Sequence, residues 1–327
     1  MYKIELGKSG LLVPTVAVGC MRISDKSEKE VSAFIDTALS NGADFFDHAD
    51  IYGGGKSEAV FGKAVTPSMR DDIIIQTKCG IRPGRFDFSY EHIISSVDGS
   101  LERLGTDYID VLLLHRPDAL MEPEEVAKAF YELKEKGKVR HFGVSNQNPY
   151  QMQLLQSALD MPLCVNQLQF SVMHAPMIQS GINVNMYNDS AVNRDGGVLD
   201  FCRLNKITIQ PWSPMQYGFF EGCFIDNEKF PELNKTLEAV GDVPVLALVN
   251  LATDVADNPL QGGVAGRELA QQEVYTLADH PLGVELDGHA CAQVELAGQA
   301  AQHRLEEAVD GLHTEVAVVV DEHRESL

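Results

Sequence analysis

Four side chains of different chemical type could together transfer a proton. They are a carboxylate, a phenol, an ammonium and an imidazole, at Asp47, Tyr52, Lys78 and His115. A nearby ammonium favours phenolate over phenol, so Lys78 would bring the pKa of Tyr52 toward neutral pH. The Asp47 carboxylate would keep Lys78 charged and oriented, and His115 could donate a hydrogen bond and relay the proton. The residue types therefore predict a general acid built around Tyr52.

Each of the four also has a simpler structural explanation. Asp47 could cap a turn, and Tyr52 could pack in a glycine-rich turn. Lys78 could be a solvated charge, and His115 a buried imidazole bonded to backbone. The position of all four at the ends of neighbouring apolar runs, or in the turn that follows, favours the chemical interpretation.

Those apolar runs are rich in β-branched residues and predict strands buried on both faces. They cover residues 15–19, 43–46, 72–77, 108–114, 139–144, 163–168 and 207–211. Segments of helical period lie between and after them. The predicted helices cover residues 28–41, 57–65, 89–104, 123–137, 148–159, 198–205 and 228–240.

Strict alternation of strands and helices is typical of an α/β fold with a parallel sheet, and an eighth unit would close the sheet as a (β/α)8 TIM barrel. The alternative is a doubly wound open sheet. A dehydrogenase of that kind carries a G-x-G-x-x-G turn directly after its first strand, and this sequence has none there. Gly53-Gly54-Gly55 follows the wrong kind of segment and is interpreted as a flexible turn. We therefore expect a barrel whose eighth unit is uncertain or replaced.

Six motifs at successive strand ends resemble those of the aldo-keto reductases. They are FFDHADIYGGGKSE, IIIQTKCG, LLLHRPD, VRHFGVSN, VNQLQFS and QPWSPM, within residues 1–240. The HADIYGGG and HRPD variants are most similar to the bacterial oxidoreductases of that family. The resemblance implies that an aldehyde or ketone is reduced by hydride from NADPH, with Tyr52 as the acid that protonates the oxygen. NAD(H) stays open as the cofactor.

The resemblance also implies a cofactor site on the same face. Ser145, Asn146 and Gln167 would hold the nicotinamide carboxamide, and Trp212 would stack on its ring. Ser213 and the loop through Gly218 would approach the pyrophosphate. On the substrate side the residues implied are Met21 and Arg22. His48 and Asp50, and the polar loop 174–197, are weaker candidates for the pocket.

The charge of the chain makes some partners improbable. A net charge of −22 does not fit binding to nucleic acid or to an anionic membrane, so a small-molecule carbonyl substrate is expected. The N-terminus lacks the pattern of a secretion signal, and no apolar run approaches the ~20 residues that span a bilayer. Six scattered cysteines show no metal-ligand spacing, which predicts no metal site and a cytoplasmic location. The oligomeric state is not indicated.

Composition changes near residue 240. Residues 241–327 hold no Lys, Phe, Ile, Met or Trp, and their 16 acidic residues against three arginines give a net charge of −13. We therefore divide the chain into a barrel domain, residues 1–240, and an atypical acidic segment, residues 241–327. That segment is either an acidic ending with helices at 266–280 and 291–309 and a strand at 316–320, or the product of a frameshift or fusion.

The resemblance implies that the eighth strand ends in a Gly-Ser/Thr turn, followed by a helix with a basic residue that holds the 2′-phosphate of NADP, and this sequence lacks that ending. Three functions therefore stay open. The first is an active reductase, the second a nucleotide-binding sensor on the same fold, and the third a catalytically defective product with an altered C-terminus. A continuous reading frame of uniform base composition, with close relatives bearing the same ending, would exclude the frameshift.

Overall fold

The computed structural model describes residues 1–217, 221–241 and 274–276. The chain forms two compact units. The first comprises Met1–Gln169, Asp195–Ser213 and Gln272–Asp279, and it contains every strand of the main sheet. The second comprises Phe170–Arg194, Pro214–Gln271 and His280–Leu327.

Seven parallel strands form a curved sheet in which each strand pairs with the next one along the chain. They are β3 (Val16–Gly19), β4 (Phe45–Asp47), β5 (Ile74–Cys79), β8 (Ile109–Leu114), β9 (Val139–Ser145), β10 (Val165–Gln169) and β11 (Thr208–Trp212). All seven predicted strands are confirmed, with ends shifted by one or two residues. The strand order never reverses, so the doubly wound alternative is wrong.

The eighth position of the sheet is taken by a strand of opposite direction. β12 (Val274–Thr276) pairs antiparallel with β3, with Val274 opposite Val18 and Thr276 opposite Val16. This segment lies inside the helix predicted at 266–280, which is therefore wrong at these residues. A three-residue strand cannot be told from a helix by period alone, and pairing with the edge of β3 decides its conformation. The predicted helix at 291–309 and strand at 316–320 lie outside the described residues.

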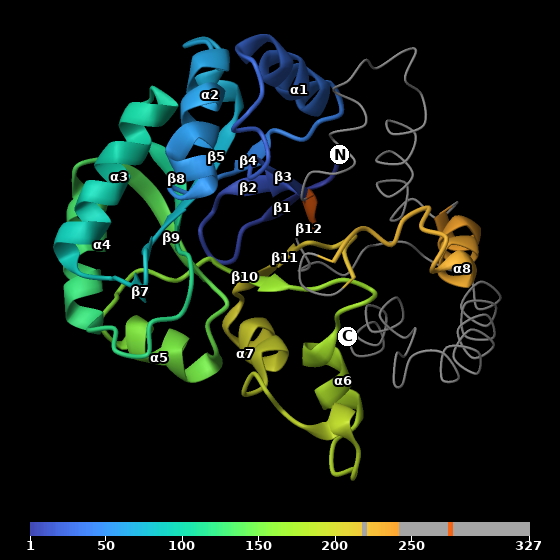
Figure 1. Ribbon diagram of the computed structural model, residues 1–327. Helices are drawn as coiled ribbons and strands as arrows, with labels where there is room; N and C mark the ends of the chain where they lie inside the picture. Colours follow the sequence, from blue (N-terminus) through green and yellow to red (C-terminus); the bar gives the residue numbers. More distant parts are fainter. Residues whose placement is uncertain (218–220, 242–273, 277–327) are drawn as a thin grey trace, which may run out of the picture. The chain divides into compact units, whose positions relative to one another are not determined.

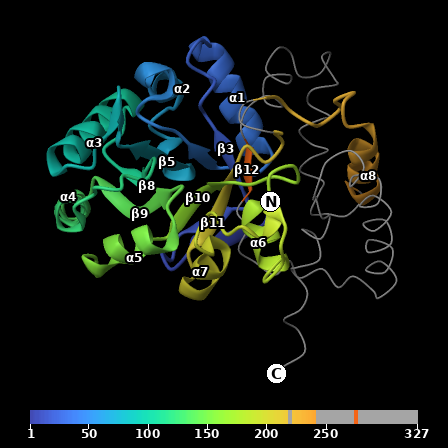
Figure 2. The same cartoon turned by 60° about the horizontal axis from the view of Figure 1, so that its bottom comes forward.

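Helices surround the curved sheet on its outer side (Figures 1 and 2). They are α1 (Glu28–Ser40), α2 (Lys56–Ala64), α3 (Tyr90–Leu104), α4 (Pro123–Glu135), α5 (Pro149–Ser157) and α7 (Val198–Asn205). Their starts follow local chemistry: Ser27 and Glu30 form a capping box on α1, and Asn148 and Gln151 form another on α5. The six helices predicted between residues 28 and 205 are confirmed. Two short 3₁₀ turns, η1 (Tyr52–Gly55) and η2 (Arg70–Asp72), precede α2 and β5.

Two hairpins were not expected from the sequence. β1 (Lys3–Glu5) pairs with β2 (Leu12–Pro14) ahead of the sheet, and β6 (Ile81–Arg82) pairs with β7 (Arg85–Phe86) after β5. The first hairpin buries its apolar side in the core. Its buried residues and their partners are Ile4, Leu6, Val13, Ala17, Phe45, Val111, Leu113, Cys164, Val165 and Trp212.

The second unit contains short elements. α6 (Pro176–Ile182) and η3 (Asp189–Ala191) lie within the polar stretch 174–197, for which the sequence predicted no helix. Pro176 at the first helical position supplies the helix start, because its fixed φ suits a helix and its missing N–H costs nothing there. α8 (Pro231–Gly241) corresponds to the helix predicted at 228–240. In the part of the chain that the structure describes, no helix is both long and apolar enough to span a membrane.

Candidate active site

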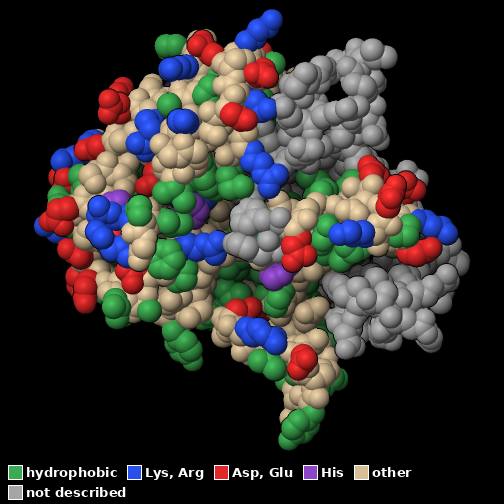
Figure 3. Space-filling model, in the orientation of Figure 1, with side chains coloured by type: hydrophobic (Ala, Val, Ile, Leu, Met, Phe, Trp, Pro, Cys, Tyr) green, Lys and Arg blue, Asp and Glu red, His purple; other side chains and the backbone are tan. Residues whose placement is uncertain are grey.

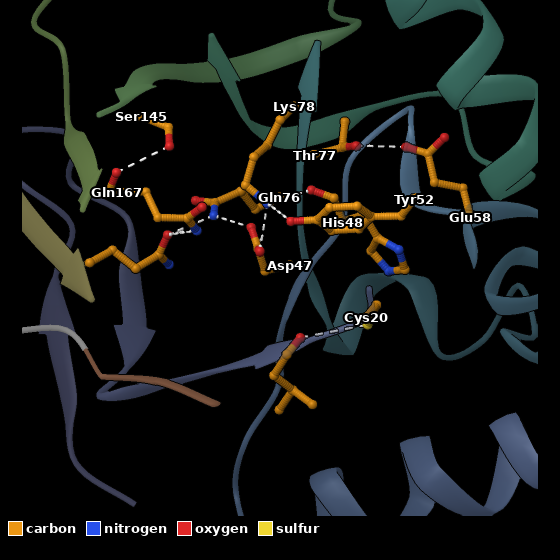
Figure 4. Close-up of polar contacts among 12 residues, drawn as sticks. Cys20, Asp47, His48, Tyr52, Glu58, Gln76, Thr77, Lys78, Ser145 and Gln167 are labelled. Atoms are coloured by element: carbon orange, nitrogen blue, oxygen red, sulfur yellow. Dashed lines mark hydrogen bonds and ion pairs between the residues drawn. The ribbon is translucent and has the colours of Figure 1, made fainter. Parts of the chain in front are cut away.

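Lys78 brings the predicted acid and carboxylate together at the carboxyl end of the sheet (Figure 4). Its ammonium donates to the Oδ2 atom of Asp47 at 2.6 Å, to the hydroxyl of Tyr52 at 3.0 Å and to the main-chain oxygen of His48 at 2.8 Å. Asp47 and Lys78 are both fully buried. The three donors of the ammonium are thereby satisfied, and its position relative to Tyr52 is fixed.

The charge on Lys78 is maintained by this environment. Burial alone would lower the pKa of Lys78, but the carboxylate of Asp47, with a further contribution from Tyr52, raises it above its usual value of 10.5. The ammonium is therefore charged at neutral pH, and it lies where negative charge would develop on the Tyr52 oxygen.

A row of amide side chains supports Asp47 from inside the sheet. Gln76 on β5 donates to Asp47 Oδ1 and to the Oε1 atom of Gln210 on β11, and Gln167 on β10 donates to that same Oε1 atom at 2.7 Å. Sequence reasoning missed Gln76 and Gln210 and placed Gln167 only against the cofactor. The signal was present, because glutamine within a run otherwise typical of a buried strand must find partners inside the fold.

The turn that carries Tyr52 is held by buried polar contacts. Gly53, Gly54 and Gly55 have φ values of 57°, 65° and 87°, which explains why the turn consists of glycines. Behind it Glu58 on α2 accepts from Thr77 at 2.6 Å and forms an ion pair with Arg103 on α3 at 2.7 Å. No sequence pattern indicates the contact between Glu58 and Arg103, which lie 45 residues apart.

His115 lies beside Tyr52, with their ring centroids 5.8 Å apart and the rings nearly perpendicular. It directly follows β8, as predicted. Burial, the Lys78 ammonium and Arg116 hold the pKa of His115 well below its usual value, so the imidazole is neutral. Its Nδ1 atom has no hydrogen-bond partner among the described residues. A neutral ring can donate from one nitrogen and accept at the other.

The residues predicted to hold a cofactor meet at the ends of β9, β10 and β11. Ser145 donates to the main-chain oxygen of Gln167 at 3.1 Å and accepts from Asn146 Nδ2 at 2.8 Å. Trp212 Nε1 donates to Asn146 Oδ1 at 3.1 Å. Ser213 is buried, with a φ of 54°. The structure therefore brings five of the six together, and Gly218 lies outside the described residues.

The predicted substrate residues follow β3. The Met21 main-chain oxygen accepts a hydrogen bond from Ser57 at 3.3 Å, and the Met21 side chain is partly exposed. Arg22 is exposed. Both lie on the loop that leaves the same end of the sheet as Asp47, because β3 and β4 are parallel and Gly19 is opposite Asp47.

Of the weaker candidates, His48 is fully buried, with its ring 4.4 Å from that of Phe61. Burial and Lys78 lower the pKa of His48 to about 3, so it is neutral, and its main-chain oxygen is the atom that contacts Lys78. Asp50 is partly buried, and burial, together with Glu58, raises its pKa from 3.8 to about 7. Asp50 therefore carries a charge that is costly above neutral pH.

An Asp50→Asn variant is expected to unfold less readily than the wild type at pH 8. The raised pKa of Asp50 in the folded protein means that its charging destabilises the fold as pH rises from about 4 through about 7. The full interval corresponds to about 4 kcal/mol, and solvent screening of this partly exposed group reduces the expected gain to about 2 kcal/mol. Urea denaturation at pH 5 and pH 8 measures it. A difference between variant and wild type that does not grow from pH 5 to pH 8 would contradict the assignment.

Comparison with known proteins identifies the family. The model of the aldo/keto reductase family matches residues 15–257. The chain belongs to the aldo/keto reductase family. This reductase is therefore an oxidoreductase from a family of NAD(P)H-dependent enzymes, and the match extends past the predicted boundary at 240. The division of the chain at 240 stays a prediction.

Bacterial relatives cover most of the reductase. The oxidoreductase YcsN of Bacillus subtilis is 32% identical in an alignment spanning 95% of this chain and 93% of YcsN. The oxidoreductase YdhF of Escherichia coli is 41% identical over 55% of this chain and 65% of its own length. A 6-dehydroglucose reductase of Agrobacterium fabrum is 36% identical over 68% of this chain and 75% of its own length. The resemblance to bacterial oxidoreductases is thereby confirmed.

Solved structures agree with the fold. An aldo-keto reductase of Bacillus halodurans, in its holo form, has a TM-score of 0.53 and 27% identity over 64% of the reductase and 65% of that chain. A thermostable aldo-keto reductase in complex with the inhibitor epalrestat has a TM-score of 0.62 over 91% of the reductase and 100% of that chain. At 22% identity the second shows the fold alone.

Proposed function

We propose that this protein reduces an aldehyde or ketone to an alcohol with NADPH, and that Tyr52 is the general acid. The contact of one buried ammonium with both the Tyr52 hydroxyl and the Asp47 carboxylate carries the proposal. That arrangement stabilises a phenolate, which is the state that Tyr52 reaches when it gives up its proton.

The side chains at the cofactor end fit a nicotinamide by their chemistry. Ser145, Asn146 and Gln167 combine a hydroxyl with two amides, which can both donate to and accept from a carboxamide. Trp212 offers an aromatic face for stacking on a planar ring. When bound, the cofactor supplies hydride to the carbonyl carbon. A structure of an aldo/keto reductase from Klebsiella pneumoniae in complex with NADP supports the choice of cofactor, and NAD(H) is the alternative.

The residues of this chain supply the proton and position the carbonyl. Tyr52 donates its hydroxyl proton to the carbonyl oxygen as negative charge develops there, which gives the alcohol and leaves a phenolate beside Lys78. Neutral His115 donates a hydrogen bond to the same oxygen and orients it. Asp47 holds the ammonium in place, and Gln76 holds Asp47. Met21 and Arg22 stay candidates for the substrate side.

The 6-dehydroglucose reductases among the relatives support a small carbonyl compound as substrate. Four buried free cysteines, Cys20, Cys79, Cys164 and Cys202, fit a reducing compartment, and we place the protein in the cytosol.

Purified protein titrated with NADPH and then with a panel of aldehydes and ketones tests the proposal. We expect a change in cofactor fluorescence followed by carbonyl-dependent oxidation of NADPH. A fluorescence change without oxidation would instead support a nucleotide-binding sensor. Absence of a folded, cofactor-binding species would support a defective product.

A further inference from the structure

Arg116 differs from most arginines of the protein in its surroundings. Six others pair with an aspartate or glutamate; they are Arg70, Arg82, Arg85, Arg103, Arg140 and Arg203. Arg116 is half-buried, and no ion pair or hydrogen bond joins its guanidinium to a residue in 1–217, 221–241 or 274–276. A buried or half-buried cation without an anion loses hydration and gains little in return.

The position of Arg116 relates it to the reacting centre. It follows His115 directly, and its guanidinium carbon lies 5.8 Å from the centre of the Trp212 ring. Burial lowers the pKa of Arg116 from its usual value, and the charge of Tyr52 opposes that effect, so the guanidinium and the phenol are within electrostatic reach. In Figure 3, basic side chains, a histidine and hydrophobic side chains lie together in the middle of the face shown. The guanidinium thus lies at the Trp212 side of the proposed site, on the residue that follows His115.

We propose that Arg116 binds a carboxylate on the substrate, so that the preferred substrates are short aldehydes or ketones that also carry an acid group. This inference rests on the proposed function. A guanidinium presents paired N–H groups that match the two oxygens of a carboxylate, which fixes both the distance and the orientation of the bound group. Binding of the acid group at Arg116 holds the carbonyl at the other end of a short molecule toward Tyr52 and His115.

The total charge of the protein explains why an anionic substrate would need a guanidinium at the site. The protein as a whole carries a net charge of −22, which repels anions at long range. An anionic substrate therefore needs a local cation, and Lys78 is already committed to Asp47 and Tyr52. Arg116 is the described cation that combines partial burial, a place beside His115 and Trp212, and no anionic partner.

A pair of substrates that differ in charge alone tests the inference. We compare kcat/KM for 4-oxobutanoate and for its methyl ester, with NADPH, in the wild type, Arg116→Gln and Arg116→Lys. The ratio of acid to ester is expected to fall by about tenfold to a hundredfold in Arg116→Gln, and by less in Arg116→Lys, which keeps the charge and loses the planar fork. Arg203→Gln, an exposed arginine on α7, removes the same charge and should leave the ratio as in the wild type.

Two further measurements identify the anion. Added salt should narrow the difference in the acid-to-ester ratio between the wild type and Arg116→Gln, because it screens the local pair with Arg116 and relieves the long-range repulsion in both proteins. The Kd for NADPH should be the same in Arg116→Gln and the wild type, which also shows that the variant is folded. A tenfold weaker Kd would assign Arg116 to the cofactor phosphates and overturn the inference. Equal losses of kcat/KM for the acid and the ester, together with a shifted pH profile, would mean that Arg116 acts on Tyr52. That result would also overturn the inference.

The result that would contradict the proposed function differs from the result that would contradict only the inference about Arg116. If the wild type reduces neither these aldehydes nor any in the panel, the proposed function is wrong and the inference with it. If the wild type reduces both and the ratio does not change in Arg116→Gln, the inference alone is wrong.

Discussion

A Tyr52→Phe variant is expected to lose carbonyl reduction while it still binds NADPH. The substitution removes the single hydroxyl that contacts the buried ammonium of Lys78 from the substrate side. Loss of a positioned general acid typically costs between 10² and 10⁴ in rate, so we expect kcat to fall by about 10³-fold. Lys78 keeps two acceptors, Asp47 and the main chain of His48, so the free energy of unfolding should fall by only about 1 kcal/mol.

Steady-state kinetics and a cofactor titration on the same preparation measure both effects. Tyr150 on α5 provides the matched control, because it is 76% exposed and its phenol can be removed without touching the site. Tyr150→Phe should keep wild-type kcat. A Tyr52→Phe variant with wild-type turnover would remove the proposed mechanism.

A Lys78→Met variant is expected to lose both activity and much of its stability. Lys78 and Asp47 are fully buried, so the substitution leaves a carboxylate without its cation inside the fold. Breaking a buried pair in this way typically costs about 3 to 5 kcal/mol. Activity should be lost as well, because no cation remains beside the Tyr52 hydroxyl. Urea denaturation and the NADPH oxidation assay measure the two losses.

The double variant Asp47→Asn, Lys78→Met separates charge from packing. Removing both charges should recover part of the lost stability but none of the activity. A double variant no more stable than Lys78→Met would show that the buried charge is not the cause. The pH dependence gives a second check. The pKa of Lys78 is raised on folding, so the stability from its charge is complete below about pH 10.5 and lost as pH rises further. Among the wild type, Lys78→Met and the double variant, only the wild type should lose this part of its stability, because only the wild type contains Lys78.

The parallel sheet explains why the site could be predicted so far. Period and composition identify the runs that become β4, β5 and β8, and parallel strands place all their carboxyl ends at one edge. That rule places Asp47, Lys78 and His115 at one edge among other polar residues, and the resemblance of the motifs to the aldo-keto reductases distinguishes them. No three-dimensional information beyond strand order was needed to bring them together.

Contacts that depend on side-chain direction could not be predicted in this way. Whether Gln76 reaches Gln210, 134 residues away, depends on the curvature of the sheet. The hydrogen bond from Lys78 to the main-chain oxygen of His48 cannot be predicted from residue types, because every residue has such an oxygen. β12 forms because the edge of β3 is available for pairing. The sequence of residues 274–276 carries no information about that edge. Arg116 lies inside the LLLHRPD motif. Its proposed role could not be inferred from that motif, because it depends on the absence of an anionic partner among the described residues.

The first hairpin, β1 and β2, can complete its packing only after β11 has been synthesised. Gly7 donates to the Thr208 hydroxyl across 201 residues, and its Cα lies so near the Cys164 backbone that a Cβ there would come within 2.3 Å of the carbonyl oxygen. The ribosome must therefore release β11 before this hairpin can reach its final place. Until then Ile4, Leu6 and Val13 lack part of their core cluster, which includes Trp212 on β11, and their apolar surface is prone to aggregation. Gly7 is thus synthesised 201 residues ahead of the Thr208 hydroxyl that accepts from it.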